Sequence, residues 1–302
     1  MNAPAPTAGT RPSACPAALL DAAVAGLRGH RLIPYLGPEA LLLEPANAAL
    51  PVAPQALAEF LAKRVAVPAR VRRNPTATAQ YIENFRHRKT LTALMREAYA
   101  VSAAAPALYR ALAALDLPLV VDANYDDAYA WLLAERAGAA PGIRPDSRDW
   151  SQIQGVSRAE VRESWFLAYG PSGTRQDAAS RGPLLYKPLG SIAPAANFII
   201  SDSDFVEVLT EIDIQTPIPP DVQERRAGRG FLFLGCRFAD QLARNYARQV
   251  MKRSAGPHYA VLPADRLTRN EVRFIAEQGI AVIDRPLADA AATLVAALAP
   301  PD

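Results

Sequence analysis

The sequence contains few of the residues from which metal and acid–base sites are commonly built. It has two cysteines, Cys15 and Cys236, and three histidines, His30, His87 and His258, in 302 residues. Two distant cysteines without a C-x-x-C spacing cannot form a disulfide framework or a cysteine-based zinc site within one chain. We therefore expect no metal ion, and a reducing cytoplasm is the expected location.

Long hydrophobic runs and a strong charge of one sign are also missing. No run approaches the ~20 apolar residues that a membrane-spanning helix needs. The opening "MNAPAPTAGTRPSACPA" lacks the basic start and apolar core of a secretory signal, so residues 1–16 are predicted to be a flexible arm. The formal net charge is only +3, which gives no argument for a nucleic acid or an anionic membrane as partner, and neither is expected.

What the sequence does contain is enough apolar material for one large domain. Hydrophobic residues make up 50% of the chain, and in its second half apolar runs such as "RGFLFLG", "PHYAVLP" and "GIAVIDRP" alternate with helical patterns. This alternation predicts an α/β fold with a Rossmann-like parallel sheet and helices on both faces. Residues 17–302 are predicted to form this single domain.

A helical module is expected within the domain, at about residues 55–115, where Ala and Leu recur at three- and four-residue spacing. Asn74 and Pro75 read as the start of one of its helices. The module also carries a cluster of basic residues, which we call the basic patch. Its members are Arg70, Arg72, Arg73, Arg86, Arg88 and Lys89.

The basic patch has two interpretations. It is either an ordinary solvated helix face or a docking surface for an acidic protein or, less expected, a nucleic acid. A homo-oligomer is expected only because such assemblies are common.

Five short segments occur in an order that is more informative than any one of them. They are "LIPYLGPEA", "LVVDANYDD", "LLYKPLGSI", "FIISDSDFVEVL" and "FLFLGCRFADQLAR". In this order they resemble the sirtuin-like domain family of bacteria, distant relatives of the NAD-dependent sirtuin deacylases. The resemblance extends from about Arg31 to Pro286. It implies that NAD, ADP-ribose or a related nucleotide binds at the carboxyl ends of the strands.

The first segment carries Gly37 at the end of a strand, where the resemblance implies a close approach of the backbone to a pyrophosphate. Pro38 and Glu39 depart from the small residues of the family at this turn. Proline has no N–H group to donate, and a carboxylate repels phosphate unless it points away.

In the second segment the resemblance makes Asn124 and Asp126 binding residues, and catalytic residues if the protein is an enzyme. The asparagine would orient the nicotinamide ribose or the attacking nucleophile, and the aspartate would contact the nicotinamide end. The alternative is local: Asn and Asp often satisfy free N–H groups where a strand turns into a helix.

The third segment adds Lys187, Gly190 and Ser191 to the implied binding residues. It also contains Leu189 at the position where the family has the histidine that acts as general base, and leucine cannot carry a proton. None of the three histidines is an obvious replacement. Lys187 would be a poor base unless strongly desolvated, and it is expected to contact a carboxylate or a phosphate.

The fifth segment carries Gly235 and Arg237 as further binding candidates. Gly235 would approach the ribose or phosphate, and Arg237 would donate to phosphate unless Asp240 holds it in an ion pair. Cys236 is expected to be a small buried thiol.

Three functions remain open. The first is a catalytically degenerate sirtuin-like protein that binds a nucleotide in a regulatory or partner-binding role. The second is an active NAD hydrolase or NAD-dependent deacylase that uses Asn124 or Asp126 to activate water. The third is an assembly protein on the same fold that binds no nucleotide.

Overall fold

The computed structural model describes residues 15–136, 151–155, 166–169, 175–176, 182–194, 196–215 and 218–299. Its centre is a sheet of nine strands within these ranges. The strands are β1 (Leu32–Leu36), β2 (Leu119–Asp122), β3 (Ser151–Gly155), β4 (Phe166–Tyr169), β5 (Arg175–Gln176), β6 (Leu184–Lys187), β7 (Gly230–Leu234), β8 (His258–Val261) and β9 (Ile280–Ile283).

The sheet is parallel over most of its width. The strand order is β5-β4-β3-β6-β2-β1-β7-β8-β9, and every neighbouring pair from β3 to β9 is parallel. The strands β4 and β5 pair in the antiparallel direction at one side. On that side β4 lies between β3 and β5, and β5 forms the edge of the sheet.

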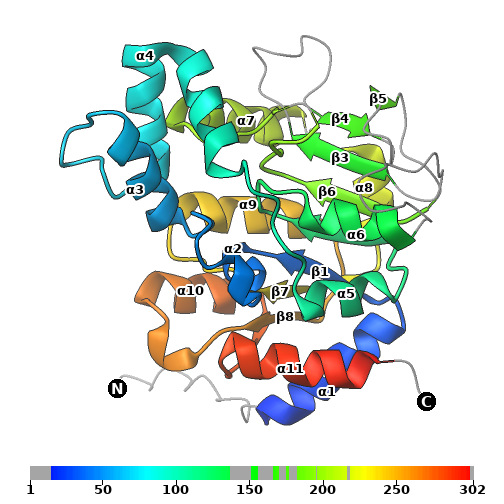
Figure 1. Ribbon diagram of the computed structural model, residues 1–302. Helices are drawn as coiled ribbons and strands as arrows, with labels where there is room; N and C mark the ends of the chain where they lie inside the picture. Colours follow the sequence, from blue (N-terminus) through cyan, green and yellow to red (C-terminus); the bar gives the residue numbers. More distant parts are fainter. Residues whose placement is uncertain are drawn as a thin grey trace, which may run out of the picture.

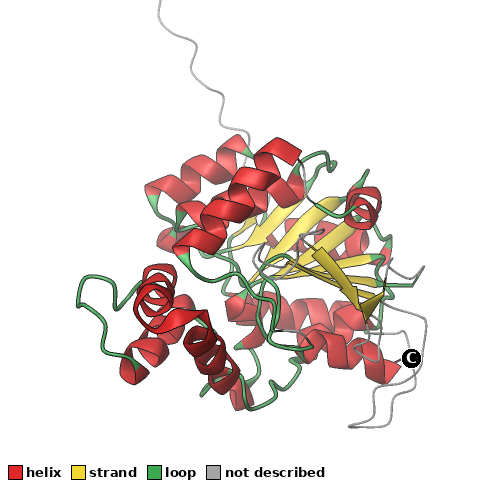
Figure 2. Cartoon of the chain, turned by 90° about the horizontal axis from the view of Figure 1, so that it is seen from above, coloured by secondary structure: helices red, strands yellow, loops and turns green. Residues whose placement is uncertain are grey.

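Helices cover both faces of the sheet (Figures 1 and 2). One face packs against α1 (Pro16–Arg28), α5 (Ala107–Ala113), α6 (Ala128–Arg136) and α11 (Leu287–Leu298). The other packs against α8 (Pro220–Arg226), α9 (Gln241–Met251) and α10 (Arg269–Glu277). The predicted Rossmann-like α/β fold is thus confirmed.

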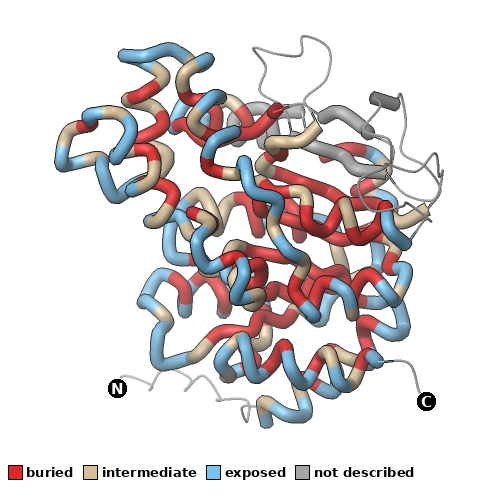
Figure 3. Tube along the Cα trace, viewed as in Figure 1, coloured by how far each residue is buried: buried red, intermediate tan, exposed pale blue. Residues whose placement is uncertain are grey.

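Strand β1 shows why the sheet needs two helical layers. Leu32 and Leu36 belong to the core on one face, whereas Ile33 and Tyr35 belong to the core on the other. Successive side chains of a strand point to opposite faces, so a strand with apolar residues at every position must be covered on both sides. Figure 3 shows the resulting buried layer through the centre of the molecule.

The helical module lies to one side of the sheet, at the left of Figure 1. It consists of α3 (Pro54–Arg64) and α4 (Pro75–Ala98), which share a core with the chain segment around Phe198. Helix α4 begins as the sequence predicts, because the Asn74 side chain accepts a hydrogen bond from the Ala77 N–H at 3.0 Å. At His87 the backbone leaves helical geometry (φ 67°, ψ 155°), which divides α4 into two helical arms.

Helix α5 differs from the sequence expectation that grouped it with the module. Its Leu108, Tyr109 and Leu112 belong to the core that lies between the sheet and α11, not to the core of α3 and α4. The apolar spacing of a helix predicts that it has a buried face, but it does not predict against which neighbour that face packs. The helix α7 (Asp202–Gln215) connects the helical module to the helices that cover the sheet, since it contacts both α4 and α9.

Candidate functional site

The carboxyl ends of β1 and β7 lie where the order of the strands reverses. From β1 the chain proceeds to β2 and β6 on one side, and it then returns to β7 on the other. Ligands of open parallel sheets bind at such a point, outside the carboxyl ends of the strands. The site therefore has to be built from the loops after β1, β2, β6 and β7.

The loops after β1 and β7 approach each other closely. The Gly37 N–H donates to Leu234 O at 2.9 Å and the Glu39 N–H donates to Gly235 O at 3.1 Å. A side chain at Gly37 would collide with the backbone of Gly235, and one at Gly235 would collide with the Ala40 N–H. These glycines thus permit contact between two loops, and the N–H groups of Gly37 and Glu39 are already engaged by protein carbonyls.

A buried ion pair joins the carboxyl ends of β2 and β6. The Lys187 Nζ lies 2.6 Å from Asp122 Oδ2, with side-chain exposures of 0% and 1%. Asp122 Oδ1 accepts two further bonds, from the Asn124 N–H at 3.0 Å and from Asn124 Nδ2 at 2.9 Å. The carboxylate expected to contact Lys187 is therefore Asp122, which also holds Asn124 in place.

Asn124 is oriented through its amino group. Its Nδ2 donates to Asp122 Oδ1 and lies within hydrogen-bonding distance of Gly37 O, at 3.3 Å, and of Tyr109 Oη, at 3.2 Å. Its Oδ1 is buried and has no partner among the described residues. Because the donor side of the amide is engaged, the side chain offers a ligand only a hydrogen-bond acceptor.

Asp126 combines a local role with an unused oxygen. Its Oδ1 accepts the Ala128 N–H at 2.8 Å at the start of α6, which is the cap that the alternative interpretation expected. Its Oδ2 is buried and unpartnered within the described part of the chain. Burial, together with the negative charge of Asp122, raises the pKa of Asp126 to about 7, although the Lys187 ammonium opposes the shift.

Aromatic side chains surround these two residues. Burial raises the pKa of Tyr109 and of Tyr99 well above the usual value, and the charges of Asp122 and Asp126 add to both shifts. The rings of Tyr99 and Tyr125 meet edge to face with centroids 6.0 Å apart. The phenols are therefore neutral hydroxyl groups at neutral pH, and the surroundings of Asp126 are of low polarity.

The turn after β6 is bonded to the turn after β2. Tyr125 O accepts the Ile192 N–H at 2.9 Å and the Ser191 hydroxyl at 3.2 Å. Gly190 adopts a positive φ of 74°, and a side chain there would collide with Asn197 O. Gly190 and Ser191 thus lie beside the Asn124–Asp126 turn, and their observed contacts position that turn.

Leu189 packs against apolar side chains. It contacts a small apolar cluster, which we call the Leu189 cluster, and its carbonyl accepts the Ile199 N–H at 2.9 Å. The members of the cluster are Leu189, Ile199, Phe205, Val208, Leu242 and Tyr246. The side chain at the predicted histidine position therefore supplies apolar contact.

The three histidines lie elsewhere. His30 precedes β1, and His258 is the first residue of β8, so both lie at the amino ends of strands, opposite the site. His30 Nε2 is 3.0 Å from Leu115 O, and the His258 Nδ1 accepts the Phe231 N–H at 3.1 Å. His87 lies at the break of α4 and is exposed. None of these three positions is at the carboxyl ends of the strands.

Arg237 is held by a residue that sequence reasoning missed. Its Nε and Nη2 lie 2.9 Å from Glu271 Oε1 and Oε2, and its Nη2 also donates to Arg266 O. Glu271 is buried, and burial is the largest single influence on its pKa, which it raises. The bonds with Arg237 and Thr268 together outweigh burial and lower the pKa to about 2. The alternative partner considered above, Asp240, instead caps α9 by accepting the Ala243 N–H at 2.7 Å.

Cys236 is the buried thiol that the sequence predicts. Its Sγ is 3.5 Å from Tyr35 O, and burial raises the pKa of the thiol far above its usual value. A protonated thiol is a poor nucleophile, so Cys236 contributes packing.

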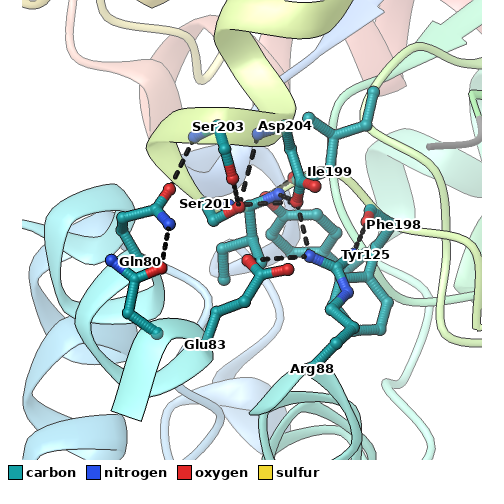
Figure 4. A network of polar contacts seen from close by, with 11 residues as sticks. Gln80, Glu83, Arg88, Tyr125, Phe198, Ile199, Ser201, Ser203 and Asp204 are labelled. Atoms are coloured by element: carbon teal, nitrogen blue, oxygen red, sulfur yellow. Dashed lines mark hydrogen bonds and ion pairs between the residues drawn. The ribbon is translucent and has the colours of Figure 1, made fainter. Parts of the chain in front are cut away.

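The Asn124–Asp126 turn is also attached to the helical module (Figure 4). The Tyr125 hydroxyl donates to Ile199 O at 2.8 Å. Arg88 donates to Phe198 O at 2.6 Å and forms an ion pair with Asp204 at 2.7 Å. The Asp204 carboxylate in turn accepts the N–H groups of Ile200 and Ser201. The network therefore ties α4 and α7 to the segment that flanks Tyr125.

Arg88 is thus directed inward, unlike the other members of the basic patch. Arg70, Arg72, Arg73, Arg86 and Lys89 are exposed. The spacing of basic residues in the sequence does not distinguish Arg88, which pairs with the buried Asp204, from its exposed neighbours.

No group of three or more His, Cys, Asp or Glu side chains in the described ranges is arranged to hold a metal ion. Over the same ranges, no helix has the length and the apolar character needed to cross a membrane.

The fold is that of a Rossmann-like α/β protein, a class in which ligands bind at the carboxyl ends of the parallel strands. Comparison with protein families gives the narrower assignment. Residues 118–283, more than half of the chain, match the SIR2-like domain. The chain therefore belongs to the SIR2-like domain family. The match includes the Asn124, Lys187 and Gly235 turns, whereas the Gly37 turn precedes it. No curated protein gives a significant match.

Proposed function

We propose that this protein binds NAD, ADP-ribose or a related nucleotide at the Asn124–Asp126 turn and serves in a regulatory or partner-binding role rather than as a catalyst. Membership of a family that is related to NAD chemistry supports the nucleotide class. The leucine at position 189 supports the absence of catalysis, because it cannot accept a proton from a ribose hydroxyl.

The observation that carries this proposal is the pair of unpartnered acceptors. Asn124 Oδ1 and Asp126 Oδ2 are buried at the carboxyl end of β2 without a hydrogen-bond donor among the described residues. Buried polar atoms are satisfied in most proteins, so two unsatisfied acceptors on one turn call for a ligand or water that donates to both. Ribose hydroxyls and a carboxamide are donors of this kind.

The fit to a dinucleotide is uneven. The unpartnered acceptors suit its ribose and nicotinamide end. The Gly37 turn does not suit its pyrophosphate, because the Gly37 and Glu39 N–H groups donate to the loop after β7 and Pro38 has none. Arg237 already binds Glu271 through two nitrogens. Affinity is therefore expected to come mainly from the uncharged parts of the nucleotide.

Calorimetric titration of the full chain with NAD and ADP-ribose tests the proposal. We expect saturable binding that Asn124→Ala weakens at least tenfold, together with no release of nicotinamide. Asp240→Asn is the control, since Asp240 is an exposed helix cap outside the site. No heat or thermal shift at millimolar nucleotide would refute nucleotide binding and would favour the assembly role.

A second candidate is an NAD hydrolase in which Asp126 is the general base. The specific observation in its favour is the pKa of about 7, since a base is most effective when its pKa is near the working pH. This candidate predicts nicotinamide release that rises with pH through about 7 and disappears in Asp126→Asn. A flat profile, or activity that persists in the variant, would refute it.

A further inference from the structure

Asn197 is a buried amide that the structure leaves without partners. It is 2% exposed, and neither its Nδ2 nor its Oδ1 has a hydrogen-bond partner among the described residues. Asn47 shows the ordinary situation. It is 1% exposed, and its amide donates to Leu41 O and Ala104 O and accepts the Ala104 N–H. An amide buried without such bonds is unfavourable, so a ligand or ordered water is expected to satisfy Asn197.

The position of Asn197 relates it to the candidate site. Its carbonyl abuts Gly190, the residue after Leu189, so closely that a side chain at Gly190 would collide with it. Phe198 faces the core of the helical module, and Ile199 belongs to the Leu189 cluster on the other side of the segment. Alternation along this extended segment places the Asn197 side chain on the same side as Ile199. Asn197 thus flanks the Leu189 cluster.

Tyr246 brings a second unpartnered group to this cluster. The residue lies in α9, is 4% exposed and packs with Leu189 and Ile199. Its ring meets that of Phe205 at 5.6 Å with an interplanar angle of 89°. Its hydroxyl has no hydrogen-bond partner within the described residues. A buried tyrosine normally finds a partner for its hydroxyl.

We propose that Asn197 and Tyr246 form a polar subsite beside Leu189, which hydrogen-bonds an uncharged donor–acceptor group of the bound nucleotide. This inference rests on the proposed nucleotide binding and adds residues that the family resemblance does not supply. The group is a hydroxyl or a carboxamide, because an amide and a phenol each donate and accept one or more bonds.

The surroundings argue against a charged ligand group. The described members of the Leu189 cluster other than Tyr246 are aliphatic or aromatic hydrocarbons. The cation beside this segment, Arg88, donates to Phe198 O and already pairs with Asp204, so a phosphate here would lose its hydration without gaining an unengaged opposite charge. A neutral group loses far less hydration free energy. The Asn197 amide and the Tyr246 hydroxyl can then form the hydrogen bonds that the group made to water before binding.

Two substitutions test the subsite with little change of shape. Tyr246→Phe removes only the hydroxyl, and Asn197→Leu replaces the amide by an apolar group of similar size. We expect each to weaken NAD binding about three- to tenfold, as expected for one or two neutral hydrogen bonds. Titrations with ADP-ribose and with nicotinamide identify the group. A loss for NAD and ADP-ribose indicates a hydroxyl, and a loss for NAD and nicotinamide alone indicates the carboxamide.

Thermal unfolding of the unliganded proteins supplies the matched control. Asn47→Leu should lower the unfolding temperature because it breaks three hydrogen bonds, whereas Asn197→Leu and Tyr246→Phe should leave it unchanged or raise it. A clear loss of stability in both site variants would overturn the inference, since it would show partners inside the protein. Unchanged affinity in both variants, with binding still lost in Asn124→Ala, would refute the subsite alone. A wild-type protein that binds neither nucleotide would refute the proposed function as well.

Discussion

Replacing Lys187 by methionine gives the sharpest test of how the site is held together. The substitution keeps most of the side-chain volume and removes the ammonium that lies 2.6 Å from Asp122 Oδ2. Asp122 would then be a buried carboxylate that retains only the two hydrogen bonds from Asn124. Removing one partner of a buried ion pair destabilises a protein by about 3–5 kcal/mol. We expect a loss in this range at pH 7, measured by urea denaturation.

The double variant Asp122→Leu/Lys187→Met tests whether the loss of stability comes from leaving a buried charge unpaired. It leaves no unpaired charge, so we expect it to be more stable than Lys187→Met, even though it lacks the ion pair. In the single variant Lys187→Met, where Asp122 remains, the pKa of Asp126 should rise further, because the Lys187 ammonium opposes that shift in the wild type. A loss below about 1 kcal/mol in Lys187→Met, or a double variant less stable than the single one, would refute the reasoning.

Three further predictions concern Asp126, Gly190 and Arg88. Because folding raises the pKa of Asp126 to about 7 from 3.8, the folded state binds the extra proton between these values. Stability in urea should therefore fall as pH rises from about 4 to 7, by at most ~1.4 kcal/mol per pH unit from this group, and Asp126→Asn should remove that part of the slope. Gly190→Ala should destabilise by more than the ~1–2 kcal/mol expected for a positive φ alone, because the new methyl group meets Asn197 O. Its control, Gly228→Ala, has a similar φ of 70° in open space and should lose only that amount. Arg88→Ala should cost about 2 kcal/mol by leaving Asp204 unpaired, whereas the exposed neighbour in Arg86→Ala should change stability by less than about 0.5 kcal/mol. Equal effects within either pair of variants would contradict the corresponding argument.

The sequence was informative wherever a local pattern decides the structure. The alternation of apolar runs and helical spacing predicted the α/β sheet, and Asn74 with Pro75 predicted the start of α4. Asn124 and Lys187 were each predicted as binding residues, and β2 and β6 bring them together because parallel strands place their carboxyl ends at the same edge. Asp122, the last residue of β2, could have been identified by the same argument, since it follows two buried valines directly.

Other features depend on residues that are distant in the chain. Glu271 reaches Arg237 across 34 positions, and Arg88 reaches Asp204 across 116. Asn197 carries no signal in the sequence, because only the folded chain shows that its buried amide has no partner among the described residues. Only the packing of the surrounding elements decides whether a polar group is satisfied.

The sequence by itself therefore determined the fold class and the family, and it pointed to the turns on which we propose that a ligand binds, because periodicity and the order of short motifs are local properties. The tertiary structure alone decided what these turns can offer. It engages the N–H groups of Gly37 and Glu39 with the neighbouring loop and pairs Lys187 with Asp122. It leaves Asn124 and Asp126 each with a buried acceptor that has no partner among the described residues. The physical reason is that hydrogen bonds and ion pairs are exclusive. A group that the protein already satisfies is not available to a ligand, and only the folded chain assigns those partners.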